Sequence, residues 1–150
     1  MSRPVVTVVG RPNVGKSSLF NRILGRKKAL VQDTPGVTRD RNYAIATIEG
    51  REFILCDTGG FEERGTVASD VMARLIREQA LVAIEESDVI VFVMDIRAGL
   101  TPVDSEIAER LRAASQPVIW VLNKCDHPSV TPQSADFYRL GVEGFALVSA

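Results

Sequence analysis

The sequence predicts an α/β fold with three layers (α/β/α), in which helices cover both faces of a six-stranded, mostly parallel sheet. Two observations support this prediction. Apolar runs of strand length alternate with segments whose apolar residues recur at helical spacing, and one pair of strand-like segments is separated only by a tight glycine turn. That turn makes one edge strand antiparallel. At 150 residues and 45% apolar content, the chain is long enough for one such domain and too short for two.

The expected elements follow one another along the chain. Continuous apolar runs indicate buried strands, and apolar residues three and four apart indicate helices. Strands are expected at 5–9, 43–49, 52–56, 89–94, 118–122 and 144–148, and helices at 17–24, 69–86, from 102 onward and, as a short one, at 135–140. Gly50-Arg51 forms the turn between the second and third strands. Two long loops, 26–42 and 57–66, are left, and loops of that length are usually functional or mobile.

The composition excludes several classes of protein. The 18 basic and 19 acidic residues leave a formal charge of −1, which argues against a strongly basic nucleic-acid module. No apolar run reaches the length of a membrane span and no secretory signal pattern is seen, so we expect a cytoplasmic protein with neither DNA nor a membrane as a partner. Cys56 and Cys125 are expected to be reduced, packed thiols, and a single histidine, His127, argues against zinc.

The segment from Gly10 to Ser17 fits the phosphate-binding pattern G-x-x-x-x-G-K-[ST], the P-loop. Its glycines let the backbone N–H groups point inward around a polyphosphate. Lys16 is expected against the β- and γ-phosphates, and the Ser17 hydroxyl on Mg²⁺. A predicted strand before the loop and a helix after it distinguish the segment from a chance match, since a helix N-terminus then faces the anion. The residues expected at the phosphates are Gly10, Arg11, Pro12, Asn13, Val14, Gly15, Lys16, Ser17 and Ser18.

Asp57-Thr58-Gly59-Gly60 has the form D-x-x-G at the end of a predicted strand. The Asp57 carboxylate can reach Mg²⁺ through a water, and the Gly60 amide can donate to the γ-phosphate. Alone the pattern is weak, because aspartate and glycine commonly begin loops. Its position after a P-loop makes it informative, because the two strands are expected to lie close together in a doubly wound sheet.

Asn123-Lys124-Cys125-Asp126 has the form N-K-x-D after another buried strand. A carboxylate at Asp126 can accept from both N1–H and the 2-amino group of guanine, whereas adenine offers neither donor. Asn123 is expected to brace the P-loop and guanine N7, and the stem of Lys124 to lie over the base. The alternative is a solvated turn after a strand. Ser149 and Ala150, the last two residues, are expected to present an amide to guanine O6.

With these motifs in view, the chain resembles the Era-like group of translational GTPases over its whole length. The residues that carry the resemblance are the P-loop, Asp33 to Asp40, Arg51-Glu52-Phe53 before Asp57 to Phe61, and Asn123 to Asp126. The resemblance implies a P-loop NTPase G domain that binds GTP and GDP with Mg²⁺. It also implies that Thr38 is the switch threonine that closes on Mg²⁺ and the γ-phosphate, although an ordinary loop threonine is an alternative.

Within this group the chain is most similar to the first G domain of bacterial members that have two consecutive G domains and serve assembly of the large ribosomal subunit. By that resemblance, residues 1–150 form a single G domain, the N-terminal fragment of a longer protein that ends inside the last guanine-binding loop. A second G domain and a KH-like RNA-binding domain are expected to follow. The large ribosomal subunit is then the expected partner of the full-length protein.

Phe61 follows the D-x-x-G motif, where many regulatory GTPases have the glutamine that orients the attacking water. A slow intrinsic turnover is expected, with Lys16, Thr38, Gly60 and Asn13 as the catalytic residues. Asn13 matches the P-loop asparagine that coordinates K⁺ in potassium-stimulated relatives, which makes K⁺ a hypothetical second cofactor. The alternative is that Asn13 only stabilises the turn of the loop.

Other functions stay open at this stage. An ATP-dependent P-loop kinase is disfavoured by the N-K-x-D motif, and a nucleotide sensor with negligible catalysis is suggested by Phe61. A tRNA-modification or iron-transport G domain is a further alternative within the Era-like group. A basic cluster is either an ordinary solvated helix end or a contact with ribosomal RNA; its members are Arg22, Arg26, Lys27, Lys28, Arg39 and Arg41.

Overall fold

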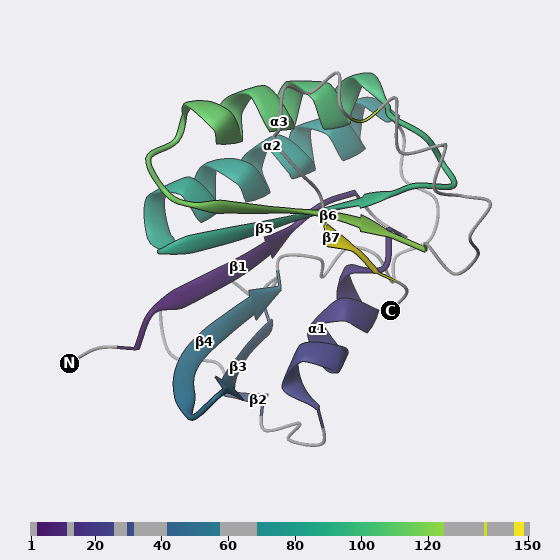
Figure 1. Cartoon of the computed structure of the whole chain (residues 1–150). Helices are drawn as coiled ribbons and strands as arrows, with labels where there is room; N and C mark the ends of the chain where they lie inside the picture. The colour runs from purple at the N-terminus through teal and green to yellow at the C-terminus, as the bar shows by residue number, and fades with distance from the viewer. Residues whose placement is uncertain are drawn as a thin grey trace.

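The computed structural model describes residues 3–11, 14–25, 30–31, 42–57, 69–124, 137 and 146–148. Ten helices and strands lie within these ranges (Figure 1). In chain order they are β1 (Val5–Val9), α1 (Lys16–Leu24), β2 (Leu30–Val31), β3 (Asn42–Ile48), β4 (Arg51–Asp57), α2 (Ser69–Glu86), β5 (Val89–Asp95), α3 (Pro102–Ala113), β6 (Val118–Asn123) and β7 (Ala146–Leu147).

The described strands form one sheet in the order β2-β3-β4-β1-β5-β6-β7. β3 runs antiparallel to both of its neighbours, and the other pairs are parallel. The predicted fold class is confirmed, but β2 adds a seventh strand, so the antiparallel strand is second from the edge. β2 has only two residues, Leu30 and Val31, too few to show any periodicity within the segment that we expected to be a loop.

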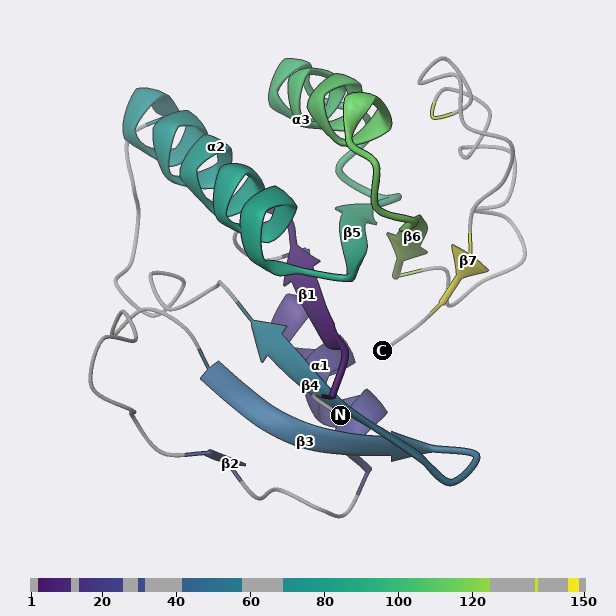
Figure 2. The same cartoon turned by 90° about the vertical axis from the view of Figure 1, so that its left-hand side faces the viewer.

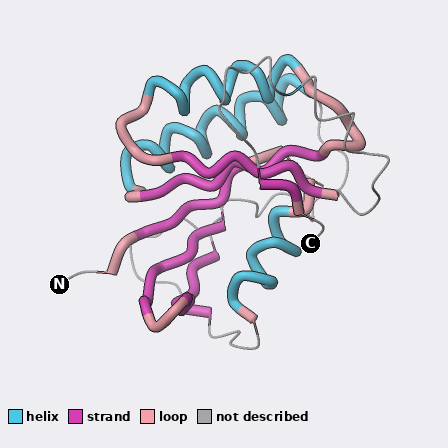
Figure 3. The backbone as a smooth tube through the Cα atoms, viewed as in Figure 1, coloured by secondary structure: helices cyan, strands magenta, loops and turns pink. Residues whose placement is uncertain are grey.

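The three predicted layers are present. α2 and α3 lie side by side on one face of the sheet, and α1 covers the other face (Figures 1 and 2). The tube in Figure 3 shows the strands as a single twisted layer between the helices. Each face has its own apolar core: one is centred on Ile76, Phe92, Ile107 and Leu122, and the other on Val8, Phe20, Leu55 and Val93.

Most element bounds match the expectations to within one residue, and α2 and β1 match at both ends. Of the strand expected at 144–148, the structure describes β7 at Ala146–Leu147, Val148 lies beyond its end, and residues 144 and 145 lie outside the described residues. The short helix expected at 135–140 lies outside the described residues except for Phe137, which is fully buried and belongs to the same apolar core as Ile76 and Ile107. Cys56 is buried in β4, and Cys125 and His127 lie outside the described residues.

α3 begins where the sequence contains its own start signal. Thr101 is the N-cap and forms a capping box with Asp104, and Pro102 occupies the first helical position. Within the described part of the chain, no helix has the length and apolar character that crossing a bilayer requires.

Candidate nucleotide-binding site

The predicted motifs meet at the carboxyl ends of the parallel strands. Val8 of β1 lies opposite Asp57 at the end of β4, and Asp95 at the end of β5 lies opposite Asn123 at the end of β6. β1 leads into the P-loop and α1 on one face of the sheet, while α2 and α3 cover the other face. In open α/β sheets, ligands bind in the crevice at the carboxyl ends of the strands, where successive connections pass to opposite faces of the sheet. The fold therefore brings motifs from three parts of the chain together at the carboxyl ends of neighbouring strands.

Close packing requires both P-loop glycines, and at Gly15 the backbone conformation requires glycine as well. Gly15 is the N-cap of α1 and adopts a left-handed conformation with φ 95° and ψ 23°. A Cβ on Gly15 would lie 2.0 Å from Nδ2 of Asn123, and a Cβ on Gly10 would lie 2.5 Å from the carbonyl oxygen of Val93. Neither position has room for a side chain, so the glycines let the loop approach the ends of β5 and β6.

Asn123 ties the predicted guanine motif to the P-loop. Its side chain is buried, and Nδ2 donates a hydrogen bond of 2.9 Å to the carbonyl oxygen of Val14. The expected bracing of the P-loop by Asn123 is confirmed. Val14 and Asn123 are 109 residues apart, so this bond joins the P-loop directly to the predicted guanine motif.

Lys16 is the first residue of α1 and its side chain is fully buried. Its Nζ atom lies 3.5 Å from Oε1 of Gln79 on α2. An ammonium group without solvent contact depends on polar partners, so the surroundings of Lys16 favour an anion that comes close to it. Gln79 was not predicted as a site residue, since a single glutamine on the apolar face of a helix gives no readable motif.

Lys124 adopts positive φ (68°) and places Nζ 2.9 Å from Oδ2 of Asp95. The other carboxylate oxygen of Asp95 accepts from the backbone N–H of Arg97 at 2.8 Å and of Ala98 at 3.3 Å. Burial by itself raises the pKa of the Asp95 carboxyl. The hydrogen bond and charge of Lys124, together with the two amides, outweigh burial and hold this pKa below its ordinary value.

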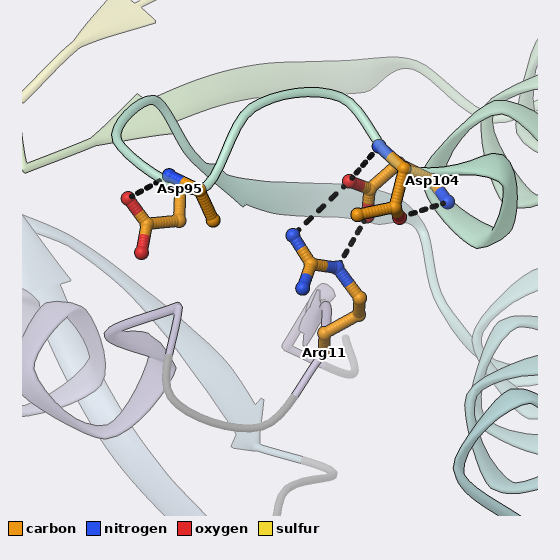
Figure 4. A network of polar contacts seen from close by, with 5 residues as sticks. Arg11, Asp95 and Asp104 are labelled. Carbon is orange, nitrogen blue, oxygen red and sulfur yellow. Dashed lines mark hydrogen bonds and ion pairs between the residues drawn. The ribbon is translucent and has the colours of Figure 1, made fainter. Parts of the chain in front are cut away.

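Arg11, the second residue of the P-loop, directs its side chain toward α3 (Figure 4). Its Nε donates to Oδ1 of Asp104 at 2.9 Å and its Nη2 to Oδ2 at 3.2 Å. This bidentate ion pair is well shielded, with side-chain exposures of 13% for Arg11 and 1% for Asp104. The Asp104 carboxylate was not predicted as part of the site, although T-x-x-D at residues 101–104 is readable as a capping pattern.

The geometry agrees with comparisons to known proteins. The family model described as "50S ribosome-binding GTPase" matches residues 5–124. This chain belongs to that family. It is 52% identical to the GTPase Der of Trichlorobacter lovleyi and 54% identical to the GTPase Der of Geobacter metallireducens, over 99% and 98% of the chain. The two alignments cover 32% and 33% of those proteins, so the chain spans about a third of the curated relatives that it matches.

A solved structure of Era in complex with MgGDPNP and nucleotides 1506–1542 of 16S ribosomal RNA superimposes on this chain with a TM-score of 0.70. The identity is 33%, and the match covers 99% of this chain and 51% of that one. The resemblance to Era-like GTPases is therefore confirmed, and the curated relatives that share about half of this chain's residues are named GTPase Der.

Several predicted site residues of this GTPase family member lie outside the described residues, and their roles stay predictions. These are Pro12, Asn13, Thr38, Thr58, Gly59, Gly60, Phe61, Asp126, Ser149 and Ala150, as well as the side chain of Ser17. Ser18 is exposed on the first turn of α1. Of the basic cluster, the structure describes Arg22, which is exposed in the last turn of α1.

Proposed function

We propose that this chain binds GTP and GDP at the carboxyl end of its sheet and hydrolyses GTP to GDP and phosphate. The observation that carries the proposal is the hydrogen bond from Asn123 to Val14, because it joins the guanine motif and the P-loop in one site. Membership of a GTPase family supports the same assignment.

Base specificity resides in Asp126 by its chemistry, since a carboxylate pairs with the two donors of guanine and with none of adenine. Calorimetric titration of the purified chain with GDP and with ADP tests this. We expect GDP to bind and ADP to bind weaker by several powers of ten. Asp126→Asn should weaken GDP binding. Equal uptake of both nucleotides, or of neither, contradicts the proposal.

The donor set near the P-loop fits Mg²⁺. Asp57 is buried at the end of β4 beside β1, and Ser17 belongs to the first turn of α1. Mg²⁺ prefers oxygen ligands and is bound by one or two protein groups together with substrate phosphates, so it needs no dedicated cluster of side chains. When bound, it neutralises charge on the β- and γ-phosphate oxygens. Thr38 and Ser17 are the hydroxyls that we assign to it, with Asp57 acting through water.

The remaining steps belong to the protein's own groups. The Lys16 ammonium stabilises the negative charge that moves toward the β–γ bridging oxygen as water attacks the γ-phosphorus. The Gly60 amide holds a γ-phosphate oxygen. Loss of the γ-phosphate removes the ligand that orders the loops containing Thr38 and Gly60, and this makes hydrolysis a switch.

Phe61 cannot orient a water by hydrogen bonding, so another group has to supply stabilising charge in the transition state. We assign this role to K⁺ held by Asn13. Turnover of GTP should be faster in KCl than in NaCl at equal ionic strength, and Asn13→Ala should remove the difference while the chain still binds GDP. Turnover that is indifferent to the two cations removes Asn13 and K⁺ from the mechanism.

A nucleotide sensor without meaningful catalysis is a second candidate, which the side chain of Phe61 favours. Single-turnover hydrolysis in K⁺ separates the two. Phosphate release within minutes to hours supports the switch, and its absence over the same time, with GTP still bound, supports the sensor.

The process served is assembly of the large ribosomal subunit in the cytoplasm, through a longer protein that contains this G domain. The family description, "50S ribosome-binding GTPase", supports the ribosomal role, and the longer protein is supported by the Der relatives, of which the chain spans about a third. Sedimentation of the full-length protein with large subunits in the presence of a non-hydrolysable GTP analogue, compared with GDP, tests it. We expect association that depends on the analogue.

A further inference from the structure

The connector between β5 and α3, residues 96–101, is attached at both ends to elements of the nucleotide site. At its start, the Ile96 N–H donates to the carbonyl oxygen of Asn123 at 3.1 Å, and Asp95 pairs with Lys124. At its end, Asp104 pairs with Arg11 of the P-loop. Figure 4 shows the connector arching from Asp95 to Asp104 above the Arg11 side chain.

Asp104 has contacts within its own helix cap that do not depend on Arg11. Its carboxylate accepts the Thr101 N–H at 3.1 Å, and its own N–H donates to Oγ1 of Thr101 at 3.2 Å. Its side chain is nearly inaccessible to solvent. A buried carboxylate in this position needs a cation, and the planar guanidinium of Arg11 supplies two parallel hydrogen bonds. The orientation of Arg11 is therefore set by α3.

Arg11 in turn restrains the first half of the P-loop. The second half is held separately, by the bond between Asn123 and the Val14 carbonyl. Pro12 and Asn13, between these two anchors, lie outside the described residues. Binding groups have to be held within a fraction of an ångström of the productive geometry for the ligand to gain their full interaction energy.

We propose that the Arg11–Asp104 ion pair is a positioning pair for the guanine nucleotide: it holds the phosphate-binding loop against the connector that also carries the Lys124 contact. This inference rests on the proposed function, because it assigns a role to the pair within the GDP site. The pair controls how long the nucleotide stays bound, and it does so without contact between the Asp104 side chain and the ligand.

The test is a double-mutant cycle on the full chain, with Arg11→Gln, Asp104→Asn and the double variant. The dissociation rate constant of a fluorescent GDP analogue and the midpoint of urea unfolding without nucleotide are measured for each. Each single variant should release the nucleotide about tenfold to a hundredfold faster. In the double variant the release rate should rise by less than the product of the two single-variant factors, because the two neutral amides can pair.

A second ion pair, which also uses a carboxylate of α3, provides a matched control. Arg77 of α2 and Glu106 of α3 also form a bidentate pair, with Nη2 and Oε1 2.9 Å apart, but the pair is partly exposed and does not touch the P-loop. Arg77→Gln and Glu106→Gln should leave the GDP release rate unchanged. Arg11→Lys keeps the positive charge but loses the two parallel hydrogen bonds of the guanidinium, so its GDP release rate should lie between those of wild type and Arg11→Gln.

The outcomes are distinguishable. If Arg11→Gln and Asp104→Asn lower the urea midpoint but release GDP at the wild-type rate, the pair is only structural and the inference is overturned. If Arg11→Gln does not fold, Arg11→Lys supplies the same comparison. If wild type itself does not bind GDP, the proposed function fails, and the unfolding cycle still reports whether Arg11 and Asp104 are coupled.

Discussion

At each end of the sheet, a side-chain amide donates hydrogen bonds to backbone carbonyls, but the consequences differ between the two ends. At the amino end, the Gln116 side-chain amide donates to the backbone carbonyls of Ile84 and Ser87. At the carboxyl end, the Asn123 side-chain amide donates to the carbonyl of Val14. The first contact joins structural elements to one another. The second sets the shape of the P-loop, so disturbing it should affect the ligand as well as the fold.

Glycines show the same contrast. Gly15 at the carboxyl end and Gly50 in the β3–β4 hairpin at the opposite end both have positive φ, 95° and 78°. A Cβ on Gly15 would overlap Asn123, whereas a Cβ on Gly50 would meet nothing within 4 Å. The hairpin glycine is needed for backbone conformation alone, and the P-loop glycine for conformation and packing together.

The largest expected effect is that of Gly15→Ala. Backbone strain and overlap with Asn123 should together lower the free energy of unfolding by about 3 kcal/mol. GDP affinity should fall at least about a hundredfold, because the loop has to move away from β6. Gly50→Ala is the control and should cost about 1 kcal/mol through strain alone, with GDP affinity unchanged. Similar GDP affinities in the two variants would contradict the contrast between the two ends. Urea titration and calorimetry provide both measurements.

Asn123→Ala is expected to have the next largest effect. It leaves the Val14 carbonyl without its side-chain donor in a buried place, which should lower the free energy of unfolding by about 2 kcal/mol and weaken GDP binding clearly. Gln116→Ala removes a comparable amide at the amino end and should cost about 1 kcal/mol in stability only. Loss of GDP affinity in the Gln116 variant would show that both ends of the sheet influence the site.

The smallest expected effect concerns Asp95 and is visible only through pH. Its pKa in the folded chain lies below the ordinary value of 3.8, so its charged form stabilises the fold above about pH 4, and this contribution is lost as the pH falls through the lower folded value. At pH 6 the free energy of unfolding of wild type should therefore exceed that of Asp95→Asn. The difference should be only about 1 kcal/mol, because Lys124 is partly exposed. The difference should shrink as the pH falls below 3.8. Urea unfolding at several pH values measures it, and a pH-independent gap would contradict the ion-pair origin.

Local sequence patterns predicted most of the architecture. The bounds of α2 and β1 follow from apolar periodicity, and the hairpin from the glycine turn between two alternating segments. β2 was missed because two residues show no period. Its place beside β3 depends on antiparallel pairing of Leu30 with Ala44, a residue outside its own sequence window.

The candidate site was predicted only in part, for a related reason. The P-loop, D-x-x-G and N-K-x-D motifs are contiguous, so each is visible in a short window. Gln79, Asp95 and Asp104 are not part of such a motif, since each is a single residue whose partner in the site lies far away in the chain.

The sequence by itself determined the strands other than β2 and the helices α1, α2 and α3, and it located the predicted phosphate and guanine motifs at the carboxyl ends of the strands. The tertiary structure alone decided that Gly15 makes room for Asn123 and that Arg11 turns away from the phosphate-binding loop's interior to pair with Asp104. The physical reason is that both facts depend on contacts between residues about a hundred positions apart, which exist only after the strands have taken their order in the sheet.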